Sequence, residues 1–243
     1  MNMKKIILVA LIMISNQFFG QELKVMTYNI RLDIASDGEN SWPNRKEKVA
    51  DLIKFYEPDV FGIQEGLPHQ VQFLDSVLSD YKVFGDGRDG GQNEEHSSIF
   101  YKSNKFELIE FDTFWLSETP NEISKGWDAA LNRICTYGLF SNKKTKQLFW
   151  VFNTHFDHVG EIARNKSAQL IHQKVSQLNI KNYPVIIMGD FNLEPQSEAI
   201  LFLSNQYVHS KSALKLIYNS GGTFNAFDFH KPISKEREID HIF

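Results

Sequence analysis

The sequence has little of several features that would narrow its class. It contains one cysteine, Cys135, in 243 residues, so an internal disulfide cannot form and no lipid-attachment cysteine follows the first apolar run. No segment is low in complexity and no unit of about 20 to 50 residues repeats, which argues against a disordered chain, a solenoid or a propeller. A chain of this length buries a core large enough to fold without disulfides.

Basic residues are scarce relative to acidic ones. The chain carries 26 Lys and Arg against 30 Asp and Glu, a net charge of −4, and removal of residues 1–20 with Lys4 and Lys5 lowers it to −6. No Lys/Arg cluster or alternation of basic and aromatic residues marks a nucleic-acid track. The charge argues against broad, non-specific nucleic-acid binding, although a nuclease whose metal supplies local positive charge stays open.

The longest apolar run lies at the N-terminus. Residues 1–20 begin with the basic MNMKK, continue with the nine-residue run IILVALIMI and end at a small residue, Gly20. This layout predicts a signal peptide over residues 1–20 rather than a buried first strand, and the run is too short to span a bilayer. We therefore expect a secreted or periplasmic monomer that begins near Gly20 or Gln21 and has no stable membrane insertion.

Hydrophobic residues make up 42% of the chain, and 20 Phe spread along its length favour a core of packed sheets. Apolar periodicity predicts helices over residues 43–56, 67–79, 161–178 and 197–203. Strands are predicted over residues 24–30, 60–64, 81–85, 97–102, 106–111, 134–140, 148–156, 185–189 and 238–243. Because consecutive strands fill the middle of the chain, two face-to-face sheets with outer helices are favoured over a simple doubly wound fold. No linker divides residues 21–243, so we expect one domain.

Polar side chains end several of these strands. They are Asn29, Glu65, His155, Asp190, Asn192 and Asp240. Each alone is more often structural than functional, because Asp and Asn commonly form turns at strand ends. As a set drawn from five segments, they predict one site where the strand ends converge.

The side chains of these strand-end residues suit few kinds of reaction. Several oxygen donors and one imidazole suit a hard cation such as Mg²⁺. A cation together with a carboxylate that activates water describes hydrolysis of a phosphate ester. His155 would donate to a non-bridging oxygen and stabilise the charge that develops there.

Six motifs carry a resemblance to a known family. In order, they are MTYNIRLD, GIQEGLPHQ, SSIFYK, NTHFDHVG, MGDFNLEP and EIDHIF. From about residue 23 to 243 the chain resembles the endonuclease/exonuclease/phosphatase superfamily, which includes deoxyribonucleases, abasic-site endonucleases, neutral sphingomyelinases and nocturnin-like deadenylases. The resemblance implies a four-layer α/β sandwich, two mostly antiparallel sheets flanked by helices, and a phosphoesterase that uses Mg²⁺ or Mn²⁺.

The resemblance also assigns roles to the strand-end residues. Glu65 matches the main metal carboxylate, and Asn29 matches the Asn beside it. His155 matches the phosphate-facing His, Asp190 the Asp that positions or deprotonates the attacking water, and Asn192 the Asn that binds a phosphate oxygen. The GDFN turn is thus expected to hold the water-activating group at the end of a buried strand.

Further residues receive weaker assignments. Tyr101 matches an aromatic hydroxyl near the phosphate, and Glu95 a partner of His155. Arg133 precedes a strand and either contacts phosphate bidentately or lies on the surface as an ordinary Arg. His158 either shapes the substrate pocket or belongs to a turn.

One motif of the family is not found. Asp240 matches the Asp that orients a second catalytic His, but that His belongs to a Ser-Asp-His motif beyond the segment matching EIDHIF. His241 does not replace it, because neighbours on a strand point to opposite faces. We therefore expect that the C-terminal strands with this motif are missing from the sequence, through truncation rather than natural loss, and that the chain as given is slow or inactive.

Three functions follow from the sequence. The first is a secreted metal-dependent phosphoesterase that hydrolyses a small-molecule or lipid-derived phosphodiester or phosphomonoester with metal- and Asp-activated water. The second is a nuclease acting on DNA or RNA, and the third is a catalytically dead sandwich that binds phosphoesters. A calcineurin-type metallophosphatase is excluded because its Asp-x-His and Gly-Asn-His-Asp motifs do not occur.

Overall fold

The computed structural model describes residues 22–215, 221–227, 230 and 237–243, and the predicted signal peptide lies outside them. Two mixed sheets form the centre of the molecule. The first has the order β1-β2-β4-β3 and the second β5-β6-β7-β8-β9. The strands of the first sheet are β1 (Val25–Asn29), β2 (Val60–Gln64), β3 (Tyr81–Phe84) and β4 (Ile99–Lys102). Those of the second are β5 (Phe106–Trp115), β6 (Ile134–Asn142), β7 (Leu148–His155), β8 (Val185–Asp190) and β9 (Asp240–Ile242).

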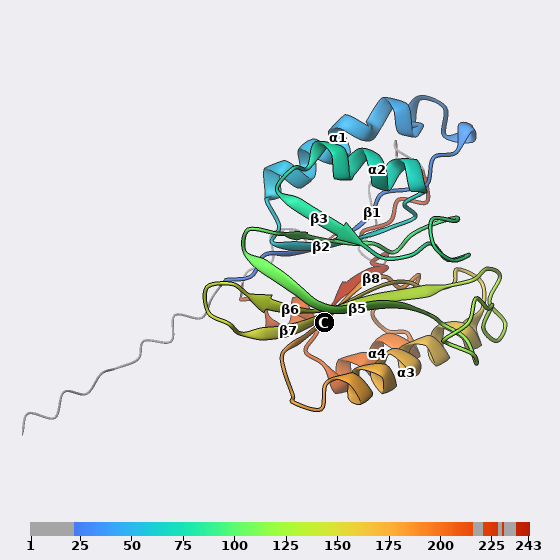
Figure 1. Ribbon diagram of the computed structural model, residues 1–243. Helices are drawn as coiled ribbons and strands as arrows, with labels where there is room; N and C mark the ends of the chain where they lie inside the picture. The colour runs from blue at the N-terminus through green and yellow to red at the C-terminus, as the bar shows by residue number, and fades with distance from the viewer. Residues whose placement is uncertain (1–21, 216–220, 228–229, 231–236) are drawn as a thin grey trace, which may run out of the picture.

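Helices cover the outer face of each sheet, which gives four layers (Figure 1). Helices α1 (Trp42–Tyr56) and α2 (Pro68–Val77) lie on the first sheet, and α3 (Glu161–Leu178) and α4 (Glu198–Gln206) on the second. Val49 and Ile53 of α1 belong to the same buried core as Phe61 of β2, and Ile171 of α3 belongs to the same buried core as Phe152 of β7. Full burial of each such side chain contributes about 1.5–3 kcal/mol, so the apolar stripes hold the helices in place. The predicted four-layer sandwich is confirmed.

A third apolar core lies between the two sheets, and a buried polar pair interrupts it. Gln64 Nε2 donates to Asn153 Oδ1 over 2.6 Å, and Asn153 Nδ2 donates to the carbonyl oxygens of Ile63 and Ser98 at 2.9 and 3.0 Å. A side chain at Gly62 would lie 2.3 Å from Asn153 Oδ1, so only Gly permits this close approach. Because buried polar groups need partners, the pair fixes the two sheets to each other.

The parallel strand pairs decide where the functional rim forms. β1 runs parallel to β2 with Asn29 opposite Gln64, and β7 runs parallel to β8 with His155 opposite Asp190. β9 runs antiparallel to β8, so its first residue, Asp240, lies opposite Asp190. The carboxyl ends of four strands and the start of β9 therefore meet at one rim.

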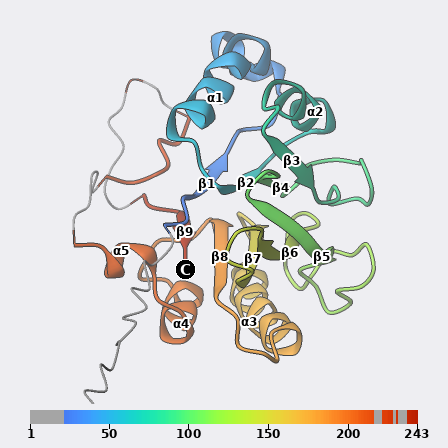
Figure 2. The same ribbon diagram turned by 60° about the vertical axis from the view of Figure 1, so that its left-hand side comes forward.

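The predicted elements recur with small differences. β5 continues to Trp115, and two short elements were not predicted, the 3₁₀ helix η1 (Ala35–Asn40) and α5 (Ser210–Ala213). Neither buries a residue, so neither leaves an apolar period in the sequence. α5 lies outside the second sheet beyond β9 (Figure 2). Within the described residues, no helix is both long and apolar enough to cross a membrane.

Candidate active site

An asparagine joins carboxylates from the two sheets at the rim. Asn29 Nδ2 donates to Glu65 Oε1 at 2.9 Å and to Asp190 Oδ2 at 2.8 Å. Asn29 Oδ1 accepts from the backbone N–H of Arg31 at 2.9 Å. The two carboxylates thus lie on either side of one donor group, as the predicted pairing of Asn29 with Glu65 requires.

Glu65 sits in an uncommon backbone conformation directly after β2. Its φ is 61°, and Arg31 and Asn192 at the same rim also have positive φ, 57° and 49°. Non-glycine residues rarely adopt this region, and such strained positions gather at functional sites. Glu65 Oε2 accepts from the backbone N–H of Leu32 at 3.0 Å and lies 3.7 Å from Arg31 Nη1. The turn therefore aims the carboxylate across the rim.

Two carboxyl groups at the rim are difficult to ionise. Burial raises the pKa of Asp190, and the neighbouring Glu65 raises it further, against the hydrogen bond from Asn29. Burial also raises the pKa of Asp240, and Asp190 directly opposite adds to this effect. Asp240 Oδ1 is buried and accepts no hydrogen bond from any residue that the structure describes. Acidic oxygens arranged like this favour a nearby positive charge.

The donor set at the rim fits a divalent cation. One ligand atom from each of Glu65, His155 and Asp190 lies within 4.8 Å of the others. Carboxylate oxygens are the ligands of hard cations such as Mg²⁺, and a cation would let the reluctant carboxyl groups ionise. Glu65 and Asp190 are therefore the residues best placed to hold it, with Asn29 beside both.

His155 is buried, which disfavours its protonated form. Burial lowers its pKa well below the ordinary value, and the positive charge of Arg133 lowers it further. Its Nε2 lies 3.1 Å from Asn192 Nδ2 and 3.8 Å from Asp190 Oδ2, and its Nδ1 lies 4.0 Å from Glu95 Oε2. Because an amide nitrogen only donates, Nε2 accepts and Nδ1 carries the proton. Donation from Nε2 to a phosphate oxygen requires the imidazolium, which a phosphate dianion alongside would favour.

The GDFN turn holds Asn192 against the end of β7. The backbone N–H of Asn192 donates to Asp190 Oδ1 at 2.8 Å, and its side chain donates to the Phe156 carbonyl at 3.0 Å. Phe191 between them is fully buried and packs edge-on against Phe156 at 4.7 Å between ring centroids. The aromatic anchor thus fixes Asp190 and Asn192 with both side chains toward the rim.

A small polar cleft opens beside His155. Its lining comprises Arg88, Glu95, His96, Ser97, Asn132, Arg133, Ile134 and His155. Arg133 is only 6% exposed, and its Nε donates to Asp157 Oδ1 at 3.3 Å. Its Nη2 lies 3.0 Å from Nδ1 of His158, whose side chain is exposed. Arg133 is therefore an anchored cation in the cleft wall, and His158 lies against it at the exposed side.

The predicted position of Tyr101 was wrong. Tyr101 lies opposite Val60, the first residue of β2, whereas Glu65 follows the other end of that strand. It is buried between the sheets and packs against Phe84 and Phe140. The opposite end of the SSIFYK segment faces the rim, because Ser97 lines the cleft. The hydroxyl of Tyr101 therefore cannot contact a phosphate at the site.

His241 lies on the far side of β9 from the rim, as the strand alternation predicted. Its Nε2 donates to the Leu193 carbonyl at 2.8 Å, and its ring packs against Phe191 and Phe243. It does not take the place of a catalytic His beside Asp240. The expectation of a further Ser-Asp-His motif stays a prediction.

The sequence analysis missed three residues that support the site. Arg31 forms a 3.1 Å ion pair with Asp37 and approaches Glu65, and Arg88 forms a 2.7 Å ion pair with Glu95. Asp157 holds Arg133 and accepts from the backbone N–H groups of Ala130, Val159 and Gly160.

Although burial alone would raise the pKa of Asp157, these backbone donors hold it well below its ordinary value. The signals were present as charges inside RLD, GRDG and HFDH. They carry no periodicity, so only the fold reveals their partners.

Comparisons with known proteins agree with this geometry. A mannosyl-6-phosphatase of Bacteroides thetaiotaomicron VPI-5482 has a solved structure that is 40% identical, with a TM-score of 0.87 over 91% of this chain and 84% of that one. An uncharacterized protein of Acanthamoeba polyphaga mimivirus is 28% identical over 83% of this chain and 79% of its own length. Mouse nocturnin is 23% identical over 82% of this chain, which spans half of nocturnin's length.

A family model extends the match to nearly the whole described fold. The model of the endonuclease/exonuclease/phosphatase family matches residues 26–243, a range that contains every residue of the rim and the cleft. The carboxylates, the imidazole and the amide of the rim are among the groups that can take part in hydrolysis of a phosphoester. The chain therefore belongs to the endonuclease/exonuclease/phosphatase family and is a hydrolase of phosphoester bonds.

Proposed function

We propose that this protein is a secreted or periplasmic Mg²⁺-dependent phosphatase that acts on a small phosphomonoester, with a sugar phosphate as the substrate class. The observation that carries the proposal is the Glu65–Asp190 pair at the rim, with the polar side chains around His155 beside it. The carboxylates suit a cation that takes the phosphate. The cleft beside His155 has a volume of only about 10 Å³, room for one water, so the polar groups around its mouth and not its interior would meet the remainder of a small polar substrate.

The metal would be held by Glu65 and Asp190 with Asn29 beside them, and Mn²⁺ would bind the same oxygen-rich set. The chemistry that such an ion would supply is polarisation of the phosphoryl group and neutralisation of its charge. Asp190, anchored by the amide of Asn29 and the backbone of Asn192, is the carboxylate placed to orient the attacking water. Asn192 and His155 lie next to it and would contact the oxygens of the phosphate.

The side chains around the cleft support a small polar substrate. Arg88, Glu95, Asn132 and Arg133 bring both donors and acceptors to this side of the rim, the mixture that the hydroxyl groups of a sugar can satisfy. The mannosyl-6-phosphatase at 40% identity supports the same substrate class. The net charge of −4 and the lack of a basic track in the sequence argue against a long nucleic acid.

The experiment compares phosphate release from mannose 6-phosphate and glucose 6-phosphate with cleavage of bis-p-nitrophenyl phosphate and single-stranded RNA. The proposal predicts Mg²⁺-dependent release from a sugar phosphate above the other substrates, at the low rate expected without a second catalytic His beside Asp240. This release should be lost in Glu65→Gln and kept in Glu107→Gln. Glu107 is an exposed residue of β5 at the end far from the rim, so it serves as a matched control. Faster cleavage of RNA would instead favour the nuclease that the nocturnin and exonuclease relatives suggest.

Export is tested separately. Residues 1–20 support a cleaved signal peptide, so protein purified from the native host should begin near Gly20 or Gln21. N-terminal sequencing measures this directly. An intact Met1 in most molecules would contradict export by cleavage.

A further inference from the structure

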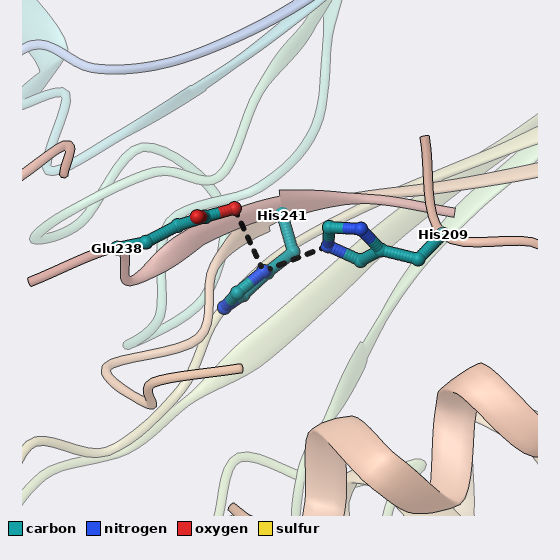
Figure 3. A group of neighbouring side chains, drawn as sticks. All are labelled: His209, Glu238 and His241. Carbon is teal, nitrogen blue, oxygen red and sulfur yellow. Dashed lines mark hydrogen bonds and ion pairs between the residues drawn. The ribbon is translucent and has the colours of Figure 1, made fainter. Parts of the chain in front are cut away.

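A second group of ligand side chains lies on the side of β9 opposite to Asp240. His209, at the start of α5, approaches His241 of β9, and Glu238 precedes the same strand (Figure 3). His209 Nε2 lies 3.0 Å from His241 Nδ1, which lies 3.9 Å from Glu238 Oε1. One ligand atom from each of the three residues lies within 4.8 Å of the others.

The ring of His241 is fixed with one nitrogen toward the group. Its Nε2 lies 2.8 Å from the Leu193 carbonyl, which only accepts, so Nε2 carries the proton. In the neutral ring, Nδ1 therefore carries a lone pair, and it accepts a hydrogen bond from His209 Nε2. A metal would replace that shared proton, with the proton of neutral His209 moving to its Nδ1. Metal-binding histidines are oriented in the same way, by donation from the second ring nitrogen to a carbonyl or carboxylate.

One carboxylate oxygen of Glu238 is fixed by an ion pair, and the other has no hydrogen-bond donor among the described residues. Lys211 Nζ contacts Oε2 at 2.6 Å, which fixes the carboxylate and balances part of its charge. Oε1 is buried, and no described residue donates a hydrogen bond to it. It points toward the two imidazoles (Figure 3). A buried carboxylate oxygen without a donor favours a cation.

We propose that His209, Glu238 and His241 form a binding site for one Zn²⁺ ion, separate from the rim that holds Glu65 and Asp190. Two imidazoles with a carboxylate suit zinc, whereas the oxygen-rich rim suits magnesium. Zn–N bonds of about 2.0–2.1 Å in a tetrahedron place two ligand nitrogens about 3.3 Å apart. The observed 3.0 Å between the two histidines is close to this, and the Glu238 oxygen has about half an ångström to close.

The surroundings also leave room for the ion. A pocket of about 330 Å³ is lined by all three residues and leaves space for a water as the fourth ligand, and Asn29 and Asp240 of the rim line the same pocket. Zinc would tie α5 to β9 across residues 210–237 and so stabilise the folded chain.

The test uses the full chain carrying Glu65→Gln, which weakens metal binding at the rim. Zn²⁺ affinity is measured by calorimetric titration, and Co²⁺ is used as a spectroscopic probe whose visible absorption intensifies in a tetrahedral site. His209→Phe removes a ligand but keeps an aromatic ring against His241 and Phe243. Glu238→Gln is the second variant, which keeps the shape of the side chain.

His172→Phe is the matched control, because His172 is partly buried and packs against Phe202 and Tyr207 on α3 and α4. We expect one Zn²⁺ per chain. Loss of a residue that only orients a metal ligand costs about 10- to 100-fold in metal affinity. We therefore expect Zn²⁺ affinity to fall by at least this factor in each of the two ligand variants and to stay unchanged in the control. Circular dichroism verifies that each variant is folded. Absence of Zn²⁺ binding, or unchanged affinity in a folded His209→Phe or Glu238→Gln protein, would overturn the proposal and leave a hydrogen-bonded cluster.

Discussion

The two faces of β9 present different chemistry from adjacent residues. Asp240 faces the rim, where carboxylates from β2, β8 and β9 gather, and His241 faces the opposite side, where it meets His209 and Glu238. The alternation of a strand thus separates a hard, oxygen-rich group from a softer, imidazole-rich one by a single residue. The comparison teaches that proximity in sequence says little about which site a side chain serves.

The largest expected effect breaks the oxygen-rich face alone. Glu65→Gln and Asp190→Asn should each lower Mg²⁺-dependent turnover by about 10²–10⁴-fold, because each removes a carboxylate that holds the ion or orients the water. Steady-state phosphate release measures the loss. Glu107→Gln should retain full activity, and equal losses in this control would show that the effect is not specific to the rim.

The second expected effect concerns pH. Burial raises the pKa of Asp190 and Asp240, so the metal-free fold binds protons that the unfolded chain releases, and its stability falls as pH rises from about 4 through the raised values. Mg²⁺ needs the ionised carboxylates, so its affinity should increase over the same range.

Calorimetric titration and thermal unfolding at several pH values measure both trends. Asp190→Asn should flatten them. Mg²⁺ affinity that does not change between about pH 5 and pH 8 would contradict the assignment of these two acids to the cation.

A third effect tests whether metal binding at the rim depends on the buried Gln64–Asn153 pair between the sheets. Asn153→Leu should lower the free energy of unfolding by about 1–3 kcal/mol, because Gln64 and the Ile63 carbonyl lose a buried partner. Mg²⁺ affinity should fall as well, since Gln64 precedes Glu65. Zn²⁺ binding should not change.

Asn142→Ala is the control for this variant, because it removes partly buried hydrogen bonds from the backbone N–H groups of Lys144 and Thr145 at the end of β6 away from the rim. It should destabilise the protein and leave Mg²⁺ affinity intact. If both variants lowered Mg²⁺ affinity equally, general destabilisation of the fold would explain the loss, and the Gln64–Asn153 pair would have no specific role.

The smallest expected effect is that of Tyr101→Phe. The hydroxyl lies between the sheets at the end of β4 away from Glu65. Turnover should therefore change by less than about twofold, the size of effect expected of a substitution away from the functional site. Steady-state kinetics on the proposed sugar phosphate measures it. A large loss in turnover with unchanged stability would return Tyr101 to the site.

Much of this arrangement could be predicted from the sequence. The apolar strands before Glu65, His155 and Asp190 mark where each strand ends, and the strand alternation places His241 away from Asp240. The predicted position of Tyr101 was wrong because β4 runs antiparallel to β2, which puts the end of β4 away from the rim. The direction of a strand in a sheet follows from the sheet order, which the local sequence does not reveal.

The partners of other residues could not be predicted either, because they lie far apart in the sequence and meet only in the fold. His209 lies 32 positions before His241, directly ahead of a short helix that buries no residue. Arg31, Arg88 and Asp157 act through contacts across loops, which leave no period in the sequence. Local pattern thus predicts elements and strand ends, whereas pairing of distant loops requires the fold.

The most direct test of the two-face account is to locate two metals in one crystal. Crystals grown with Mn²⁺ and Zn²⁺ give anomalous difference maps on either side of each absorption edge, so the two ions are told apart. The account predicts a manganese peak beside Glu65 and Asp190 and a zinc peak between His209, Glu238 and His241. Both metals at the rim, with no density between the two histidines, would contradict it.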